Sequence, residues 1–256
     1  MTGRERRLLR MLCMTASSGG GGGGDDGGDK PFDELTWDQV IASTKTGKYK
    51  TFTVGDMKEL DLGTEGIVHM QIVGIDVDDL ADGSGKAPLT FISKELLKTN
   101  HRMNPSLTPS SAPYTEGTGS IGGWEKCEMR TYLKTTIKPL IPENVRNAIK
   151  NVVKYSNGYD TNGTKIMNGI TTDDVWIPSC REVHDTANPE TVGCTYDSLF
   201  SDYTNRKKEI TGTSNFDLWF TRTGGSKDRI RAVNGGGNII NYFPNYLGYI
   251  ALGFCL

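Results

Sequence analysis

The sequence predicts an α+β fold in which two helices pack on a small, mostly antiparallel sheet. Three observations lead to this prediction. Short runs rich in β-branched and aromatic residues recur along the chain, two longer segments have helical spacing, and the connections between them are rich in Gly, Asn and Thr. Such a high loop content is typical of a scaffold that displays loops.

A glycine-rich leader precedes the predicted domain. Residues 17–30 read SSGGGGGGDDGGDK, and glycine buries no side chain and loses the most entropy when it is ordered. We therefore expect a disordered leader and linker over residues 1–31 and one folded domain over residues 32–256. The basic first residues are followed by an apolar part that is too short and too interrupted for a secretory signal.

The first part of the domain is predicted to be extended. Its runs are rich in β-branched residues and are bounded by Gly, Asp or Pro. In the longest run, alternation places Val68, Met70 and Ile72 on one face of the strand. The three predicted strands are residues 50–54, 67–77 and 88–92.

Two helices are expected in the middle of the chain, over residues 122–137 and 142–154. The first segment has good helix formers after a glycine pair. The second begins with Pro142, a residue that suits the first helical turn. Its apolar residues are spaced i, i+3, i+4, i+7 and i+8, which gives one apolar stripe. The stripe consists of Val145, Ala148, Ile149, Val152 and Val153.

Loops alternate with short apolar strands in the rest of the domain. Two Asn-Gly pairs in residues 156–164 predict turns. The predicted strands that follow are residues 174–179, 216–222, 237–243 and 249–256.

Charge, hydropathy and cysteine content exclude several classes of protein. The formal net charge is -2, so bulk electrostatics attract the chain neither to nucleic acid nor to an anionic membrane. No apolar run approaches the roughly 20 residues of a membrane span, and we expect no membrane insertion. The cysteines number five and include no C-x-x-C pair, which favours reduced, partly buried residues over a zinc site or disulfide framework. They are Cys13, Cys127, Cys180, Cys194 and Cys255.

Three motifs have residue types that bind cofactors or metals, or that catalyse reactions. GTGSIG at residues 117–122 follows a Pro/Ser-rich loop instead of a strand, which favours a plain loop over a dinucleotide site. The acidic loop of residues 76–82 suits either calcium or a turn in which carboxylates accept local backbone hydrogen bonds. Cys180 and His184 would face each other only on a helix, so a structural turn is the simpler interpretation. We expect no cofactor, no metal and no catalytic residue.

The stretch before the last apolar strand has a different composition. Tyr gives rigid amphipathic contact area and Asn gives adaptable hydrogen bonding, a mixture typical of binding surfaces. An ordinary Asn/Gly-rich loop with aromatics tucked into the core is the alternative. Arg and the aromatic residues would anchor a ligand, and Phe243 fits either contact or core. The predicted contacts are Ser226, Asp228, Arg229, Arg231, Asn234, Asn238, Asn241, Tyr242, Phe243, Asn245, Tyr246 and Tyr249.

Several segments in order resemble a large family of domains of unknown function found in gut bacteria and their phages. These segments are GDMKEL, DVDDLADGSGKAPLTFISKELL, HRMN, GGWEKCEMRTYL, LIPENVRNAIKNVVK, DDVWIPSCREV, LWFTR and ALGFCL. The resemblance spans about residues 35–256, which is the whole predicted domain.

That family is similar to C-type-lectin-fold proteins, among them the variable proteins of diversity-generating retroelements. The resemblance implies a C-type-lectin-like fold that closes by pairing its first and last strands, with Phe254 in the core and Trp176 and Trp219 beneath the display loops. In the variable proteins the C-terminal segment changes at template adenines, and residues 221–256 look like such a segment. The calcium-lectin signatures are absent, and the catalytic cysteine pair of formylglycine-generating enzymes has no counterpart here.

We therefore expect a non-enzymatic display protein that binds a cell-surface protein or glycan. Its expected setting is a phage tail or other adhesion structure, or the bacterial cell surface. A homo-oligomer is compatible with this hypothesis. Two alternatives stay open: a structural module of a phage particle that uses the same surface for subunit contacts, and an enzyme based on Cys180 and His184 or on the acidic loop.

Overall fold

The structure of the protein is a computed structural model that describes residues 30–104, 117–183 and 190–256. Contacts divide the chain into two units, Met1–Lys30 and Pro31–Leu256. The helices and strands described below all belong to the second unit. Residues 1–29 of the predicted leader lie outside the described residues.

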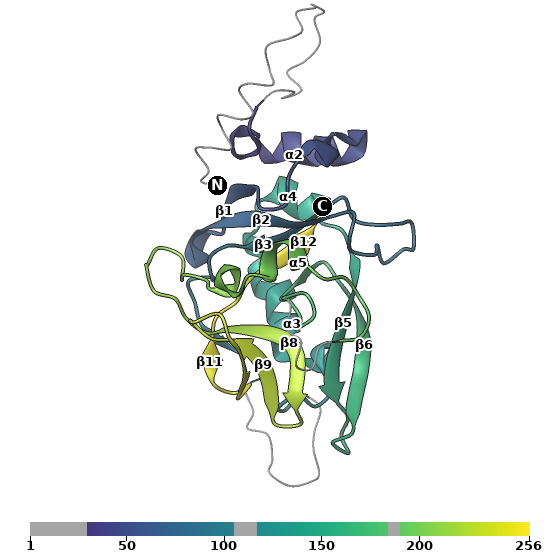
Figure 1. The fold of residues 1–256 in the computed structure, drawn as a ribbon, viewed down its shortest axis with the longest axis vertical. Helices are drawn as coiled ribbons and strands as arrows, with labels where there is room; N and C mark the ends of the chain where they lie inside the picture. Colours follow the sequence, from purple (N-terminus) through teal and green to yellow (C-terminus); the bar gives the residue numbers. More distant parts are fainter. Residues whose placement is uncertain (1–29, 105–116, 184–189) are drawn as a thin grey trace, which may run out of the picture. The chain divides into compact units, whose positions relative to one another are not determined.

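A five-stranded sheet with the order β1-β2-β3-β12-β7 forms the centre of the second unit (Figure 1). Each strand pairs antiparallel with its neighbour. The sheet and the helices around it confirm the mixed α+β class. The strands are β1 (Met57–Asp61), β2 (Ile67–Ile75), β3 (Leu89–Ser93), β7 (Val175–Trp176) and β12 (Gly253–Cys255).

The apolar residues of β2 and β12 hold this sheet in the core. Val68, Met70 and Ile72 are fully buried, as the alternation predicts. Phe254 is also buried, and its ring lies 5.5 Å from that of Phe91 on β3. The last strand, however, lies between β3 and β7, whereas the first strand β1 pairs only with β2 in this sheet. The expected pairing of first and last strands is therefore wrong in detail.

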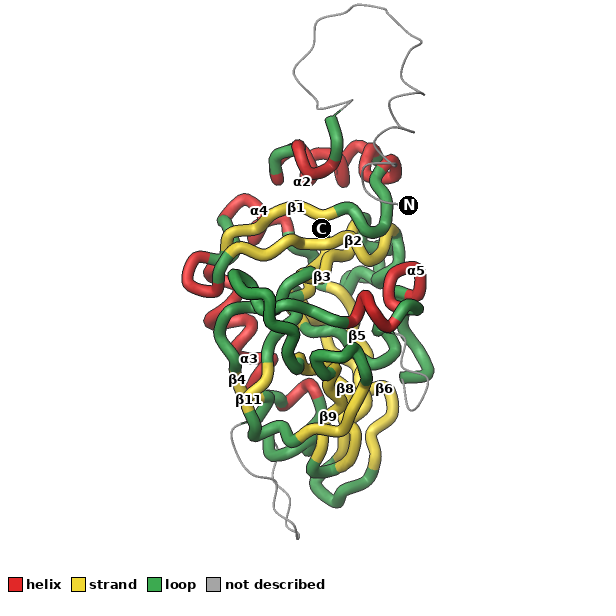
Figure 2. Tube along the Cα trace, turned by 60° about the vertical axis from the view of Figure 1, so that its left-hand side comes forward, coloured by secondary structure: helices red, strands yellow, loops and turns green. Residues whose placement is uncertain are grey.

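Three smaller sheets lie to one side of this sheet, below it in Figure 2. β8, β9 and β10 form an antiparallel sheet, β5 and β6 form a long hairpin, and β11 pairs with β4. Their bounds are β4 (His101–Arg102), β5 (Val152–Tyr159), β6 (Lys165–Asp173), β8 (Trp219–Ser226), β9 (Arg229–Val233), β10 (Ile239–Tyr242) and β11 (Leu247–Gly248).

Helix α2 (Trp37–Thr46) is a feature that the sequence-based prediction missed. Thr36 accepts a hydrogen bond from the backbone N–H of Gln39, and the Gln39 side chain accepts one from the backbone N–H of Thr36. This capping box starts the helix, and Gly47 ends it with a φ of 79°. The signal was therefore present in the sequence as T-W-D-Q before a run of helix formers.

The two expected helices are only partly present. Residues 124–126 and 128–140 are helical, but they consist of short α, π and 3-10 pieces, with an extended residue, Cys127, between them. Helix α4 (Glu143–Ala148) is shorter than expected, and β5 begins at Val152. The expected helix is wrong from residue 149 onward, because the β-branched pair Val152 and Val153 pairs with Asp173 and Thr172 of β6 instead.

The predicted strand over residues 50–54 is also wrong. The chain forms a 3-10 turn, η2 (Lys48–Thr51), and the true first strand begins at Met57. The remaining short helices are η1 (Phe32–Glu34), η3 (Gly63–Glu65), η4 (Trp124–Lys126), α3 (Glu128–Tyr132), the π-helical η5 (Leu133–Ile137), η6 (Lys138–Leu140), α5 (Asp197–Phe200) and η7 (Tyr203–Arg206).

Two sets of predicted core residues are confirmed. Trp176 and Trp219 are fully buried. The four cysteines among the described residues are free thiols, and Cys194 is the one that retains some exposure. Within the same residues, no helix is both long and apolar enough to cross a membrane.

Candidate functional site

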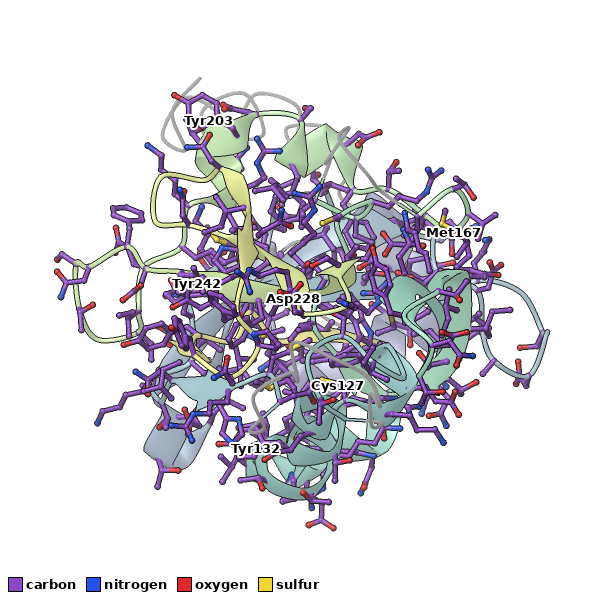
Figure 3. All side chains as sticks on the ribbon, turned by 90° about the horizontal axis from the view of Figure 1, so that it is seen from below. Cys127, Tyr132, Met167, Tyr203, Asp228 and Tyr242 are labelled. Atoms are coloured by element: carbon purple, nitrogen blue, oxygen red, sulfur yellow. The ribbon has the colours of Figure 1, made fainter. Side chains whose placement is uncertain are left out.

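The twelve predicted contact residues, called here the C-terminal surface, all have exposed or half-exposed side chains. They lie on β8, β9 and β10, on the turns between these strands and on the loop that leads to β11, except Tyr249, which follows β11. Figure 3 views the molecule from this end, with Asp228 and Tyr242 near the centre of the view. Tyr246 is the most exposed of the aromatic members, at 51%.

Neighbouring aromatic rings, in tilted or edge-on contact, and one guanidinium form the middle of the C-terminal surface. The Arg229 guanidinium lies 3.1 Å from the centroid of the Phe243 ring. The Phe243 ring lies 5.1 Å from that of Tyr246, and the Tyr246 ring lies 5.9 Å from that of Tyr242. The Tyr242 ring in turn lies 6.2 Å from that of the buried Phe220. Phe243 is thus half-buried and contacts surface side chains, and the cluster connects the surface to the core.

Backbone hydrogen bonds hold the loop that carries these rings. The N–H of Asn104 donates to the carbonyl of Pro244 over 2.9 Å, and the N–H of Tyr246 donates to the carbonyl of Phe243 over 3.1 Å. Leu247 then pairs with Arg102 between β11 and β4. Because these bonds use main-chain atoms, they restrain the loop whatever side chains it carries.

Some predicted contacts also serve the local backbone. Asn234 Oδ1 accepts hydrogen bonds from the N–H groups of Gly236 and Asn238, both over 3.0 Å, and so closes the β9–β10 turn. Ser226 Oγ donates to Asp228 Oδ1 over 2.6 Å, and this bond lowers the pKa of the Asp228 carboxyl. These three side chains therefore have structural partners in addition to their exposed surface.

Two further residues of the C-terminal surface, Tyr249 and Arg231, differ in how accessible their side chains are to a ligand. Tyr249 is half-buried and its backbone bonds to Leu218 and Phe220, so its main role is to join the loop to β8. Arg231 is half-exposed, and its Nε is a buried donor with no hydrogen-bond partner among the described residues. Because this nitrogen is buried, it is not itself a contact point for a ligand.

A second group of side chains, called here the buried charge cluster, consists of Asp78, Lys154, Glu182 and Arg222. Lys154 Nζ donates to Asp78 Oδ1 over 2.6 Å and to Glu182 Oε1 over 3.1 Å. Arg222 binds Glu182 with two hydrogen bonds of 2.6 and 2.8 Å. All four side chains are almost fully buried, and their charges sum to zero.

Other side chains complete this cluster. Lys154 Nζ also donates to the Tyr196 hydroxyl over 3.0 Å and lies 3.4 Å from the centroid of the Trp176 ring. The hydroxyls of Thr90 and Tyr196 donate to Asp78 Oδ2 over 2.7 and 3.0 Å. For the Asp78 carboxyl, the attraction of its partners outweighs the effect of burial on the pKa. Burial alone would raise the pKa of the Asp78 carboxyl, but Lys154 and the hydrogen bonds lower that pKa to about 2.

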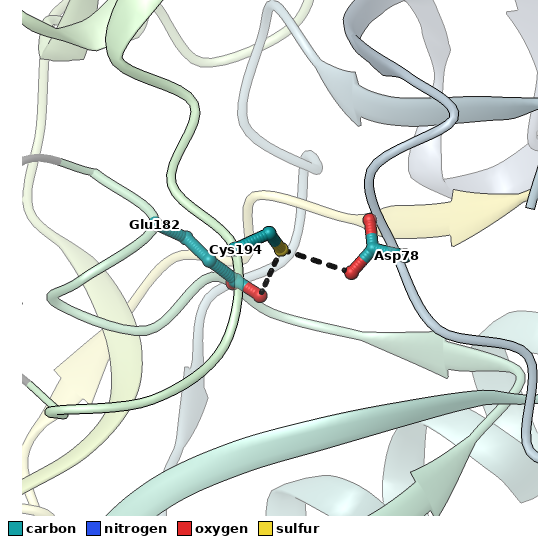
Figure 4. A group of neighbouring side chains, drawn as sticks. All are labelled: Asp78, Glu182 and Cys194. Atoms are coloured by element: carbon teal, nitrogen blue, oxygen red, sulfur yellow. Dashed lines mark hydrogen bonds between the residues drawn. The ribbon is translucent and has the colours of Figure 1, made fainter. Parts of the chain in front are cut away.

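Three side chains beside Lys154 are of types that bind metal ions, but the charges around them do not favour a metal ion. One atom each of Asp78, Glu182 and Cys194 lies within 4.8 Å of the others (Figure 4). The ammonium of Lys154 and the guanidinium of Arg222 already balance both carboxylates. Burial and the nearby Asp78 carboxylate raise the pKa of the Cys194 thiol, which keeps it protonated.

Where the structure describes them, the three motifs singled out in the sequence contribute to turns, loops and the core. Residues 117–122 form a tight loop that reaches β5 through the hydrogen bond from the Gly122 N–H to the Tyr159 carbonyl. In the acidic loop, Asp82 accepts hydrogen bonds from Ser84, as expected of a local turn, whereas Asp78 points into the core. Cys180 is buried, and His184 lies outside the described residues.

Sequence reasoning missed the buried charge cluster, although one signal was available. Lys154 stands in the apolar run NVVKY, and Arg222 follows the apolar run LWFT. A charged residue inside a strand that is otherwise apolar requires a buried partner. The sequence does not say which carboxylate that partner is, because Asp78 and Lys154 are separated by 76 residues.

Comparison with known proteins adds one match and two negative results. Residues 90–249 match a family described as a domain of unknown function, DUF6273. No curated protein matches the chain. No solved structure matches it either.

Proposed function

Since this chain belongs to the DUF6273 family of domains of unknown function, we propose from its own geometry that it is a non-enzymatic ligand-binding protein. The C-terminal surface holds the ligand, which is a cell-surface protein or a glycan. The arrangement of Arg229, Phe243 and Tyr246 carries this proposal. Aromatic rings on a restrained loop, held against a guanidinium on β9, offer large contact area at a small cost in conformational entropy.

Polar groups around the rings support the same role. The exposed amides of Asn238 and Asn241 offer hydrogen bonds to ligand oxygens. Hydroxyls and carbonyls of a glycan or of a protein loop both present such acceptors. The surface therefore combines apolar contact with donors that point to an oxygen-rich ligand.

The scaffold in this proposal is a C-type-lectin-like fold. In support, the last strand β12 returns into the central sheet, and the segment before it forms a separate sheet that carries the C-terminal surface. An experimentally determined structure superposed on C-type lectin domains tests this assignment. A different strand order in the central sheet would contradict it.

The proposal also includes sequence variation at this surface, of the kind produced by diversity-generating retroelements. It is supported by the loop's attachment through main-chain hydrogen bonds, which leave side chains of the surface free to change. The setting is then a phage adhesion structure or the bacterial cell surface. The flanking DNA gives the test: a near-copy of the codons for residues 221–256 that differs at template adenines, beside a reverse transcriptase gene.

A binding experiment tests the function directly. The full chain is applied to a glycan array and to intact gut bacteria, beside Tyr246→Ala and the control Met167→Ala. Met167 has a similar exposure, 46%, and lies on β6, away from Tyr242 in Figure 3. We expect Tyr246→Ala to lose about tenfold or more in affinity, as removal of an aromatic anchor does, while Met167→Ala binds like the wild type. Equal loss in both variants, or wild-type binding by Tyr246→Ala, contradicts the proposal.

One observation favours a second function, assembly into a larger particle through the same surface. Tyr246 and Leu247 are adjacent and both about half exposed, at 51% and 52%. Neighbouring exposed apolar side chains are common at subunit contacts. Light scattering distinguishes the two functions, because an assembly module forms oligomers that dissociate in the double variant Tyr246→Ala, Leu247→Ser.

A further inference from the structure

We propose that Lys154 and Asp78 join through an isopeptide bond between Nζ and Cγ, which makes a covalent cross-link between β5 and the acidic loop. The amine nitrogen and the carboxylate oxygen Oδ1 are 2.6 Å apart, and both side chains are 1% exposed. A third group, Glu182 Oε1, lies 3.1 Å from the same nitrogen. A lysine, an aspartate and a second carboxylate are thus held together in a buried site. A reaction between the lysine and the aspartate there needs no external reagent.

The reaction balances within these residues. The Nζ–Cγ bond forms and the Cγ–Oδ1 bond breaks, so that one carboxylate and one ammonium become one amide and one water molecule. Nothing is oxidised or reduced. The cluster is neutral before the reaction, and afterwards Glu182 and Arg222 remain as a neutral pair joined by two hydrogen bonds. No buried charge is therefore left without a partner.

Protons have a path between the reacting groups. The resting pair is a carboxylate and an ammonium, so Nζ must lose a proton before it attacks. Asp78 Oδ1 accepts the first proton directly over 2.6 Å. Glu182 Oε1 accepts the second and returns it to Oδ1, which leaves as water. Glu182 is in this sense a catalytic residue, because it contacts the reacting nitrogen.

The other carboxylate oxygen is placed to hold the charge that develops during attack. Asp78 Oδ2 accepts hydrogen bonds from Thr90 Oγ1 over 2.7 Å and from the Tyr196 hydroxyl over 3.0 Å. Two donors fixed on one oxygen stabilise the tetrahedral intermediate as an oxyanion hole does. The Trp176 ring, 3.4 Å from Nζ, restricts the lysine end to the carboxylate side.

Burial and proximity both favour the amide. A charged pair loses hydration when it is buried, whereas the amide is neutral and needs only ordinary hydrogen bonds. Fixed geometry replaces a bimolecular encounter with an intramolecular one, which is worth several orders of magnitude in rate. The released water has an exit, because Asp78, Glu182 and Cys194 line a small cavity that is also lined by the exposed residue Val192.

Mass spectrometry of the denatured, reduced full chain tests the cross-link. We expect an intact mass below the sequence mass by one water molecule. After trypsin digestion, the peptides that contain Asp78 and Lys154 are expected to be joined, with no cleavage after Lys154. Lys208 is the internal control, because it is equally buried but its Nζ donates to the backbone carbonyls of Ser93 and Lys94. Trypsin should cleave after Lys208.

Two variants make the result specific. Lys154→Arg keeps the positive charge but should retain its full sequence mass. Asp78→Asn should release ammonia instead of water and reach the same final mass as the joined wild type, which a purely structural contact would not produce. A folded wild-type chain with the unmodified sequence mass overturns the inference. So does a loss of water with Asp78 and Lys154 in separate peptides. Neither outcome depends on whether the C-terminal surface binds a ligand.

Discussion

The guanidinium of Arg229 stacks on the ring of Phe243, with 3.1 Å between the guanidinium carbon and the ring centroid. Arg229 is fixed on β9, whereas Phe243 begins the loop that carries Tyr246. The contact therefore ties the loop to the three-stranded sheet through side chains, in addition to the main-chain bonds at Pro244 and Leu247. It also shows how an arginine can serve both the fold and the C-terminal surface.

The first prediction concerns this contact. Arg229→Ala should lower the free energy of unfolding by about 0.5–1 kcal/mol, the value of a cation–π pair at a partly exposed site. A double-mutant cycle with Phe243→Leu, measured by urea denaturation, isolates the coupling. Strict additivity of the two single changes would show that the stacking contributes nothing.

A larger effect is expected at the buried charge cluster. Arg222→Met removes the cation that binds the Glu182 carboxylate through two hydrogen bonds, and removing one member of a buried pair costs about 3–5 kcal/mol. Chemical denaturation gives the value. The matched control is Lys86→Met at the exposed pair with Asp79, where the expected change is below about 1 kcal/mol. If both variants lost a similarly small free energy of unfolding, the buried charge cluster would have to be hydrated in solution.

The pH dependence of stability should report Lys208. Burial, with a smaller contribution from the charge of Lys94, lowers the pKa of its ammonium from 10.5 to about 7, and the neutral backbone carbonyls that it contacts do not offset this shift. At pH values between about 7 and 10.5, Lys208 is protonated in the unfolded chain but mostly neutral in the folded chain, so the unfolded chain binds more protons. The free energy of unfolding should therefore rise with pH from about 7 to 10.5, and below pH 7 this group should add no slope.

Lys208→Met is the matched variant for this pH profile. It should remove that rise and be more stable than the wild type near neutral pH by on the order of a few kcal/mol. Urea denaturation at a series of pH values measures both effects. Parallel pH profiles for the two proteins would show that Lys208 is solvated or paired in solution.

A steric prediction follows from the closing strand. A Cβ atom at Gly253 would lie 2.5 Å from Cζ3 of the buried Trp176 ring. Gly253→Ala should therefore destabilise the domain by about 1–3 kcal/mol, as overpacking of a core does. Gly236→Ala, which meets only the flexible ends of Asn234 and Asn238, is the control for a thermal denaturation experiment. Similar melting temperatures for the two variants would contradict the packing of β12 on Trp176.

Local patterns predicted the strands better than the helices. The β-branched run of β2 and the apolar end of the chain depend on nearest neighbours. The predicted strand over residues 67–77 therefore matches β2, and the one over residues 249–256 contains β12, which begins only at Gly253. The helix expected over residues 142–154 failed at its second half because a stripe of β-branched residues also suits a strand, and pairing with β6 decided between the two. The capping box of α2 was a local signal that was present but not used.

The sequence by itself determined the mixed class and the composition of the C-terminal surface, because both depend on residue types that stand close together in the chain. It also indicated that Lys154 and Arg222 were charges inside apolar runs. Only the tertiary structure decided which carboxylates face them and which rings stack on Arg229. Those contacts join residues far apart in the chain, and their distances follow from how the sheets pack rather than from any local spacing.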